Sequence, residues 1–92
     1  MYYVLIKGES YLGLEFDERE QIREGLRKRL EENGVRFLQY DWVWDEQDQC
    51  LLLVGRYEQI SDASLWIKAL ESMGFELLIR TNLPGDGASN AD

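Results

Sequence analysis

One stretch of the chain, VRFLQYDWVWDEQDQCLLLVGRY from Val35 to Tyr57, is apolar on both faces when its residues are placed in β-strands. Successive side chains of a strand point to opposite faces, so Leu38, Tyr40, Trp42 and Trp44 share one face, and Val35, Phe37 and Val43 share the other. A small domain with helices on one side of its sheet needs only one apolar face. The stretch therefore raises the question of what covers the second face.

The N-terminal third of the chain predicts a strand and a helix. Residues 2–7, YYVLIK, are rich in aromatic and β-branched side chains, as strands are. A helix is expected to begin at a capping Asp17, with Glu20 three residues later, and to end at a left-handed Gly34. Gly25 on this helix is expected to let its backbone approach the sheet.

The remaining elements follow from the same signals. The opening stretch predicts two strands, about 35–44 and 50–57, joined by the polar linker DEQDQ. A second helix is expected from a capping Ser61 to Gly74, and the segment FELLIRTNL predicts a last strand.

The predicted element order is β-α-β-β-α-β. Because each crossover is right-handed, the expected fold is α+β: a four-stranded antiparallel sheet, with the first and third strands central and both helices on one face. Residues 1–83 are expected to form this single domain. Residues 84–92 have no apolar anchor and are expected to form a disordered tail.

Charge and composition argue against several kinds of partner. The chain has 92 residues, enough for one domain, and a formal net charge of -8 from 18 acidic and 10 basic residues. Such a chain repels phosphate backbones, so no nucleic-acid partner is expected. The N-terminus MYYVLIKGES lacks the basic segment of a secretory signal, and no stretch approaches the roughly 20 apolar residues of a membrane span. We expect a cytoplasmic protein with no membrane partner.

The residues used most often in catalysis are scarce. The chain has no histidine and one cysteine, Cys50, so it has neither the usual general base nor a cysteine cluster for zinc. We expect no cofactor and no metal ion, and catalysis is the less favoured alternative. Cys50 is expected to be a buried structural residue.

Two segments carry a family resemblance. The run MYYVLIKGE that leads into the first helix, and the run LVGRYEQISDASLWIKALESMGF, resemble the ferredoxin-like plait and, more narrowly, the dimeric α/β-barrel superfamily. The resemblance spans nearly the whole ordered chain but lies in topology and residue types, not in a diagnostic motif. It implies that two copies pair through the open face of the sheet. The superfamily includes monooxygenases, isomerases, haem-handling enzymes and amino-acid-responsive regulators, several of which rely on a histidine that this chain lacks.

The second sheet face predicts an interface. If the helices cover Val4, Ile6, Val35, Phe37, Phe75, Leu77 and Ile79, strand alternation sends the interface candidates to the far face: Tyr3, Leu5, Leu38, Tyr40, Trp42, Trp44 and Leu78, with Arg80 beside them. An exposed apolar patch rich in Trp and Tyr is typical of an interface, and a two-fold pairing makes the patch complementary to itself. The alternative is that the strand twists or bulges near Asp41, so that Trp42 and Trp44 fold over a sheet edge and complete the core.

A small-molecule site is predicted between the loop GESYLGLEF and the tryptophans. Tyr11, Trp42 and Trp44 would line an apolar pocket, and Arg80 would bind the polar end of a ligand. A row of arginines on the first helix is interpreted as a salt-bridged, solvent-facing surface instead: Arg19, Arg23 and Arg27, each close to one of Glu20, Glu24 and Glu31.

Three hypotheses for function follow. The leading one is a non-enzymatic interaction or regulatory module that homodimerises through the aromatic face of its sheet. The second is a small-molecule-binding protein or cofactor-free enzyme of the dimeric α/β-barrel type. The third is an acidic inhibitor that occupies a nucleic-acid-binding protein.

Overall fold

The computed structural model describes residues 1–43 and 48–82. Its elements, in chain order, are β1 (Tyr2–Ser10), α1 (Phe16–Glu32), β2 (Asp41–Val43), β3 (Gln49–Tyr57), the short 3-10 helix η1 (Ile60–Ala63), α2 (Ser64–Ser72) and β4 (Glu76–Arg80). The predicted tail, 84–92, lies outside the described residues, and so does Trp44.

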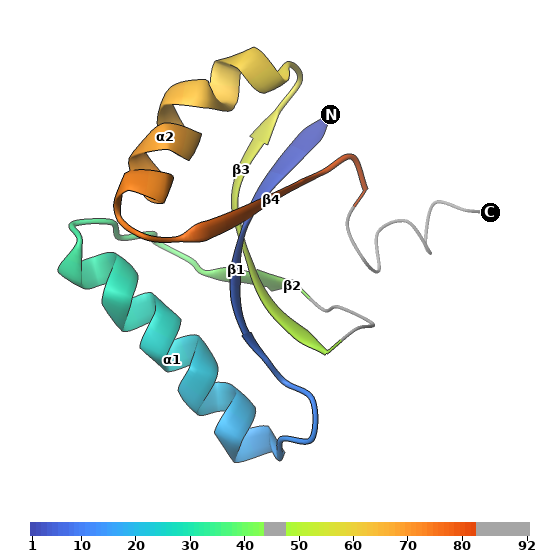
Figure 1. Cartoon of the computed structure of the whole chain (residues 1–92), viewed down its shortest axis with the longest axis vertical. Coiled ribbons are helices and arrows are strands. Elements are labelled where there is room, and N and C mark those ends of the chain that lie inside the picture. The colour runs from blue at the N-terminus through green and yellow to red at the C-terminus, as the bar shows by residue number, and fades with distance from the viewer. Residues whose placement is uncertain (44–47, 83–92) are drawn as a thin grey trace.

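The four strands form one antiparallel sheet in the order β2-β3-β1-β4. The first and third strands are central, as the sequence predicted. Both helices lie on the same side of this sheet (Figure 1). The fold is therefore α+β, with a four-stranded antiparallel sheet and two helices, and it is consistent with a ferredoxin-like arrangement.

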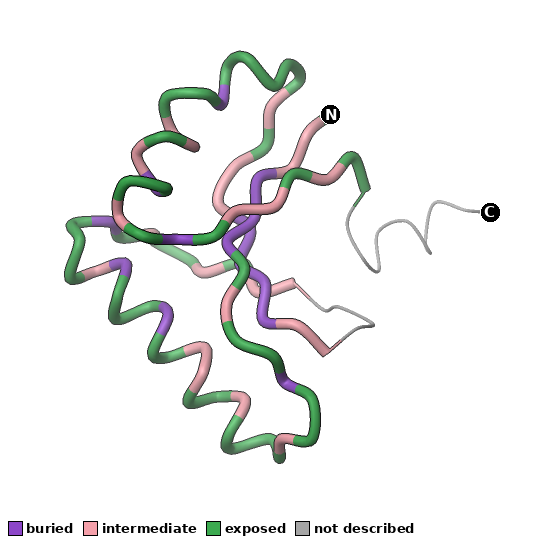
Figure 2. The backbone as a smooth tube through the Cα atoms, in the orientation of Figure 1, coloured by how far each residue is buried: buried purple, intermediate pink, exposed green. Residues whose placement is uncertain are grey.

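The main core lies between the sheet and the helices. Ile6 of β1 and Leu52 of β3 are completely buried there against Leu30 of α1 and Leu70 of α2. Figure 2 shows the buried backbone running through the middle of the central strands and recurring along one side of α1. The two helices thus cover one face of the sheet, and apolar side chains from both the helices and the strands form the core between them.

Helix α1 begins earlier than the sequence predicted. Its N-cap is Glu15, and the Glu18 carboxylate accepts a hydrogen bond from the Glu15 backbone N–H at 3.1 Å. The expected cap, Asp17, instead lies inside the first turn, where its charge suits the helix dipole. The predicted stop is confirmed, because Gly34 has a left-handed φ of 85°.

Close packing of α1 on the sheet occurs at Gly8, and the expectation for Gly25 is wrong. A Cβ atom at Gly8 would lie 3.1 Å from both Cβ and Sγ of Cys50 and 3.5 Å from Cδ2 of Leu26. A Cβ atom at Gly25 would meet nothing within 4 Å. It is therefore the absence of a side chain at Gly8, and not at Gly25, that makes space for Cys50 and Leu26 to pack.

The predicted long second strand is wrong. Among the described residues of this segment, only Asp41–Val43 pairs with β3, because the residues before it bond to α1. The Val35 N–H donates to the Leu30 carbonyl at 2.9 Å, and the Tyr40 hydroxyl donates to the Glu31 carboxylate at 3.1 Å. Residues 35–40 therefore lie outside the strands, although Val35, Phe37 and Tyr40 still contribute to the core.

The second helical segment also begins differently from the prediction. Ser61, the expected cap, lies inside η1, and α2 starts at Ser64. Its end is as predicted, since Gly74 has a left-handed φ of 92°.

Gly8 on β1 and Gly25 within α1 make a matched test of this packing. Gly8→Val is expected to lower the free energy of unfolding by about 1–3 kcal/mol, since the added methyl groups overpack a full site. Gly25→Ala is expected to raise it by about 0.5–1 kcal/mol, since a helix former replaces glycine in open space. Chemical denaturation of both variants measures the difference, and a Gly8 variant as stable as the wild type would contradict the packing.

Candidate functional site

A pocket of about 220 Å³ opens between the β1–α1 connection, the first half of α1 and the edge strand β2. We call it the Tyr11 pocket; its lining residues are Tyr11, Phe16, Glu20, Arg23, Trp42 and Val43. Three of them come from α1 at spacings of four and three residues, which places them on one face of the helix. The pocket combines three aromatic rings with one carboxylate and one guanidinium.

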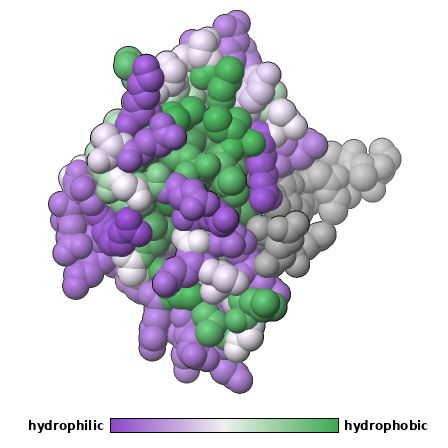
Figure 3. Space-filling view, viewed as in Figure 1, coloured by the Kyte–Doolittle hydropathy of each residue, from purple (hydrophilic) through white to green (hydrophobic). Residues whose placement is uncertain are grey.

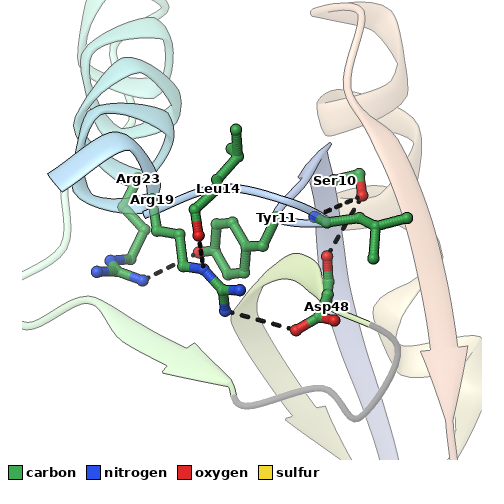
Figure 4. Close-up of polar contacts among 7 residues, drawn as sticks. Ser10, Tyr11, Leu14, Arg19, Arg23 and Asp48 are labelled. Carbon is green, nitrogen blue, oxygen red and sulfur yellow. Dashed lines mark hydrogen bonds and ion pairs between the residues drawn. The ribbon is translucent and has the colours of Figure 1, made fainter. Parts of the chain in front are cut away.

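Tyr11 is held in place by contacts between two loops. Its backbone N–H donates to the Asp48 carbonyl, and its own carbonyl accepts from the Leu14 N–H at 3.0 Å. The Ser10 hydroxyl accepts from the Leu12 N–H at 3.1 Å and lies 3.5 Å from the same Asp48 carbonyl (Figure 4). Asp48, the residue before β3, therefore positions Tyr11, the residue that follows β1.

The Tyr11 side chain is buried, with 7 % of its surface exposed. Arg23 Nη1 donates to its hydroxyl oxygen at 3.3 Å. Burial raises the Tyr11 pKa to about 12, and the hydrogen bond with Cys50 adds to this effect while Arg23 opposes it. Burial likewise raises the pKa of the Cys50 thiol, so both groups are held in their neutral forms.

Two guanidinium groups lie over the Tyr11 ring. The Cζ atoms of Arg19 and Arg23 are 5.4 Å and 5.5 Å from its centroid, within the range of cation–π attraction (Figure 4). Arg19 is fixed on its other side, where Nε donates to the Leu14 carbonyl at 3.1 Å and Nη1 lies 3.5 Å from the Asp48 carboxylate. Arg23 forms an ion pair with Glu20.

The arrangement is suited to binding. Its aromatic walls accept an apolar group, and Arg23, whose side chain is only 15 % exposed, supplies directional donors beside them. The neutral, buried thiol of Cys50 is a poor nucleophile, since the thiolate is the reactive form. The structural role predicted for Cys50 agrees with its complete burial.

The structure brings together two of the four predicted ligand residues. Tyr11 and Trp42 line the same pocket. Trp44 lies outside the described residues. Arg80 is far from the pocket in the sheet: it pairs with Tyr3 on β1, and Arg56 pairs with Tyr3 from the other side.

Arg23 occupies the polar position that the sequence analysis gave to Arg80. The salt bridges expected along α1 are present, from Glu20 to Arg23 and from Glu24 to Arg27 at 3.4 Å. The expectation that Arg23 faces solvent is nevertheless wrong. The signal that could have identified it is its position beside Ile22 and three residues before Leu26, at the border of the apolar stripe of the helix.

The predicted placement of the aromatic segment is also corrected. Tyr40 and Trp42 pack against the core on the helix side, and Leu38 is fully exposed outside any strand. In the register of β2, Trp42 lies opposite Leu52, which faces the helices, and Val43 lies opposite Leu51, which faces away. Trp42 therefore follows the alternative in which it completes the core.

Three predicted interface residues do share the face that lacks a helix among the described residues. We call it the helix-free face; its apolar cluster consists of the buried Leu5, Leu51 and Leu53 and the partly buried Tyr3, Val43 and Leu78. Leu5 and Leu51 have no exposed surface, and Leu53 has 7 %. The centre of this face is thus more deeply buried than the sequence suggested, and the accessible apolar atoms lie around it.

The raised pKa of Tyr11 predicts a specific loss of stability in alkali. Because the folded pKa of about 12 exceeds the ordinary value of 10.0, the neutral hydroxyl contributes stability that is complete below pH 10 and is lost as the pH rises through 12. Tyr11→Phe removes this group. The wild type is expected to lose about 1–3 kcal/mol more than the variant across this interval, measured by denaturation at each pH. Parallel curves for the two proteins would contradict the assignment.

Comparisons with known proteins give no family for this chain. Neither protein-family models, nor curated proteins, nor solved structures yield a match. Within the described residues no helix has the length and apolar character needed to cross a membrane, and no cluster of acidic or cysteine side chains is arranged to hold a metal ion.

Proposed function

We propose that the chain is a cytoplasmic, non-enzymatic interaction module with a ferredoxin-like plait, which homodimerises through the helix-free face of its sheet. The observation that supports this most directly is the apolar cluster on that face, in which Tyr3, Val43 and Leu78 are only partly buried. Antiparallel sheets with one face in water alternate apolar and polar residues, whereas the run CLLLV in β3 is apolar at every position. A strand of this kind is typical of a sheet that is covered on both faces.

The border of the helix-free face has the character of an interface rim. At one end Lys7 pairs with Glu76 across neighbouring strands, with 3.1 Å between Nζ and Oε2. At the other end Arg56 and Arg80 flank Tyr3. An apolar centre inside a polar rim is the usual anatomy of a protein interface, and a two-fold axis would set each patch against its own copy.

Leu78 and Ile79 give a matched test of self-association. They are consecutive in β4, so Leu78 points to the helix-free face while Ile79 points to the other face, where it is 47 % exposed. Leu78→Lys is expected to convert a particle of twice 10.8 kDa into one of 10.8 kDa, because a buried lysine is costly at an apolar interface. Ile79→Lys is expected to leave the dimer intact.

Size-exclusion chromatography with light scattering measures both masses, and circular dichroism checks that both variants are folded. A wild-type monomer at every concentration, or equal dissociation by the two substitutions, would refute self-association through this face.

A second candidate function is binding of a small molecule in the Tyr11 pocket. The specific observation in its favour is the meeting of Tyr11, Trp42 and Arg23 around one cavity. Figure 3 shows apolar surface at the lower end of the molecule, over the β1–α1 connection, and Leu12 and Phe16 in that region are 75 % and 70 % exposed. The volume of about 220 Å³ is below the roughly 300–1,000 Å³ of drug-sized sites, so the pocket suits a single ring with a short substituent.

A neutral aromatic probe tests this second function. Phenylacetamide is expected to produce saturable shifts of the Tyr11 and Trp42 signals in amide NMR spectra of labelled protein. Phe16→Ser is expected to weaken binding several-fold, because it removes an apolar wall. Leu65→Ser is the matched control, since Leu65 is also a highly exposed apolar residue, at 82 %, but lies on α2. Equal weakening by both substitutions would count against the pocket.

A further inference from the structure

We propose that the Tyr11 pocket binds small aromatic carboxylates, and that the ligand carboxylate takes the place of Glu20 on the Arg23 guanidinium. This inference rests on the second function proposed above and specifies its ligand class.

Arg23 is placed to receive a carboxylate. Its side chain is 15 % exposed, and it lines the pocket beside the rings of Tyr11 and Trp42. In the described part of the chain its guanidinium donates through Nη1 to Tyr11 and through Nη2 to Glu20. A guanidinium has five N–H donors in a planar fork that matches a carboxylate. It can therefore donate two parallel hydrogen bonds to the carboxylate of a ligand.

Glu20 already shows where such an acid would sit. Its carboxylate pairs with Arg23 from three residues away on the same helix and also lines the pocket. The Glu20 side chain is 49 % exposed, whereas that of Arg23 is 15 % exposed, so it is the Glu20 side of the ion pair that faces solvent. A ligand that brings its own carboxylate together with an apolar ring can therefore displace Glu20 into solvent.

A cationic ligand fits these charges less well. Three aromatic rings and a carboxylate could form a cage for an ammonium group. However, the guanidinium groups of Arg19 and Arg23 already lie over the Tyr11 ring, at 5.4 Å and 5.5 Å from its centroid. The Tyr11 ring thus already has two guanidinium partners, and the one that lines the pocket, Arg23, attracts an anion. The Tyr11 hydroxyl adds no negative charge, since it stays neutral.

The experiment compares phenylacetate with phenylacetamide, which has the same ring and no charge. Both are titrated into labelled wild-type protein and followed by amide NMR at Tyr11, Phe16 and Trp42. Phenylacetate is expected to bind more tightly than the amide. Glu20→Gln keeps the shape of the side chain but removes the competing carboxylate, so it is expected to strengthen phenylacetate binding by about twofold to fivefold. It should leave phenylacetamide binding unchanged.

Two further variants serve as controls. Glu24 is paired with Arg27 at 3.4 Å on the same helix, outside the pocket, so Glu24→Gln is expected to change neither affinity. Arg23→Gln is expected to remove the preference for phenylacetate, and its retained binding of phenylacetamide would show that the pocket is still formed.

The outcomes separate the ligand class from the pocket itself. Equal affinities for the two probes, or no gain from Glu20→Gln, would refute the carboxylate class while the pocket function stands. Failure of both probes to give saturable shifts would refute both proposals.

Discussion

The structure depends on two central strands that bury apolar side chains on both of their faces. Leu5 and Ile6 are consecutive in β1, point to opposite sides of the sheet, and have no exposed surface. Leu51 and Leu52 are likewise consecutive in β3, fully buried, and on opposite sides of the sheet. Two helices cover one side only, so each central strand carries a second apolar surface that the helices do not use. This constraint fixes the register, because a slip by one residue would exchange the two apolar sets, and it is the reason why association through the helix-free face is proposed.

Local signals were sufficient for most of the fold. The strands β1 and β3, the central position of both, and the left-handed ends of the helices at Gly34 and Gly74 follow from short stretches of sequence. The direction of the side chains before Val43 could not be predicted in this way. Strand alternation holds only where the chain forms a strand, and residues 35–40 do not form one. Tyr40 bonds to Glu31 and stacks on Trp42, with 6.2 Å between ring centroids, so two aromatic rings assigned to the far face turn to the helices instead.

The sequence predicted two residues of the candidate site, Tyr11 and Trp42, but not Arg23, whose position depends on tertiary contacts. That the β1–α1 loop meets the aromatic segment follows from topology, and Tyr11 and Trp42 do line one pocket. Which arginine joins them depends on contacts far apart in the sequence. The Asp48 carbonyl fixes the Tyr11 backbone, the Asp48 carboxylate holds Arg19, and the placed ring then draws Arg23 inward. Helical spacing alone gave three equivalent arginines, and only this packing distinguishes them.

Val43 connects the two surfaces for which functions are proposed. It lines the Tyr11 pocket and also packs against the cluster of Leu5, Leu51 and Leu53 on the helix-free face. The strand that carries it has three residues and, within the described sheet, pairs only with β3. Trp42 and Val43 are consecutive residues of this strand, so the strand contributes to both surfaces. Where both proposals hold, linkage requires that the ligand change the affinity of self-association by the same factor as self-association changes the affinity for the ligand.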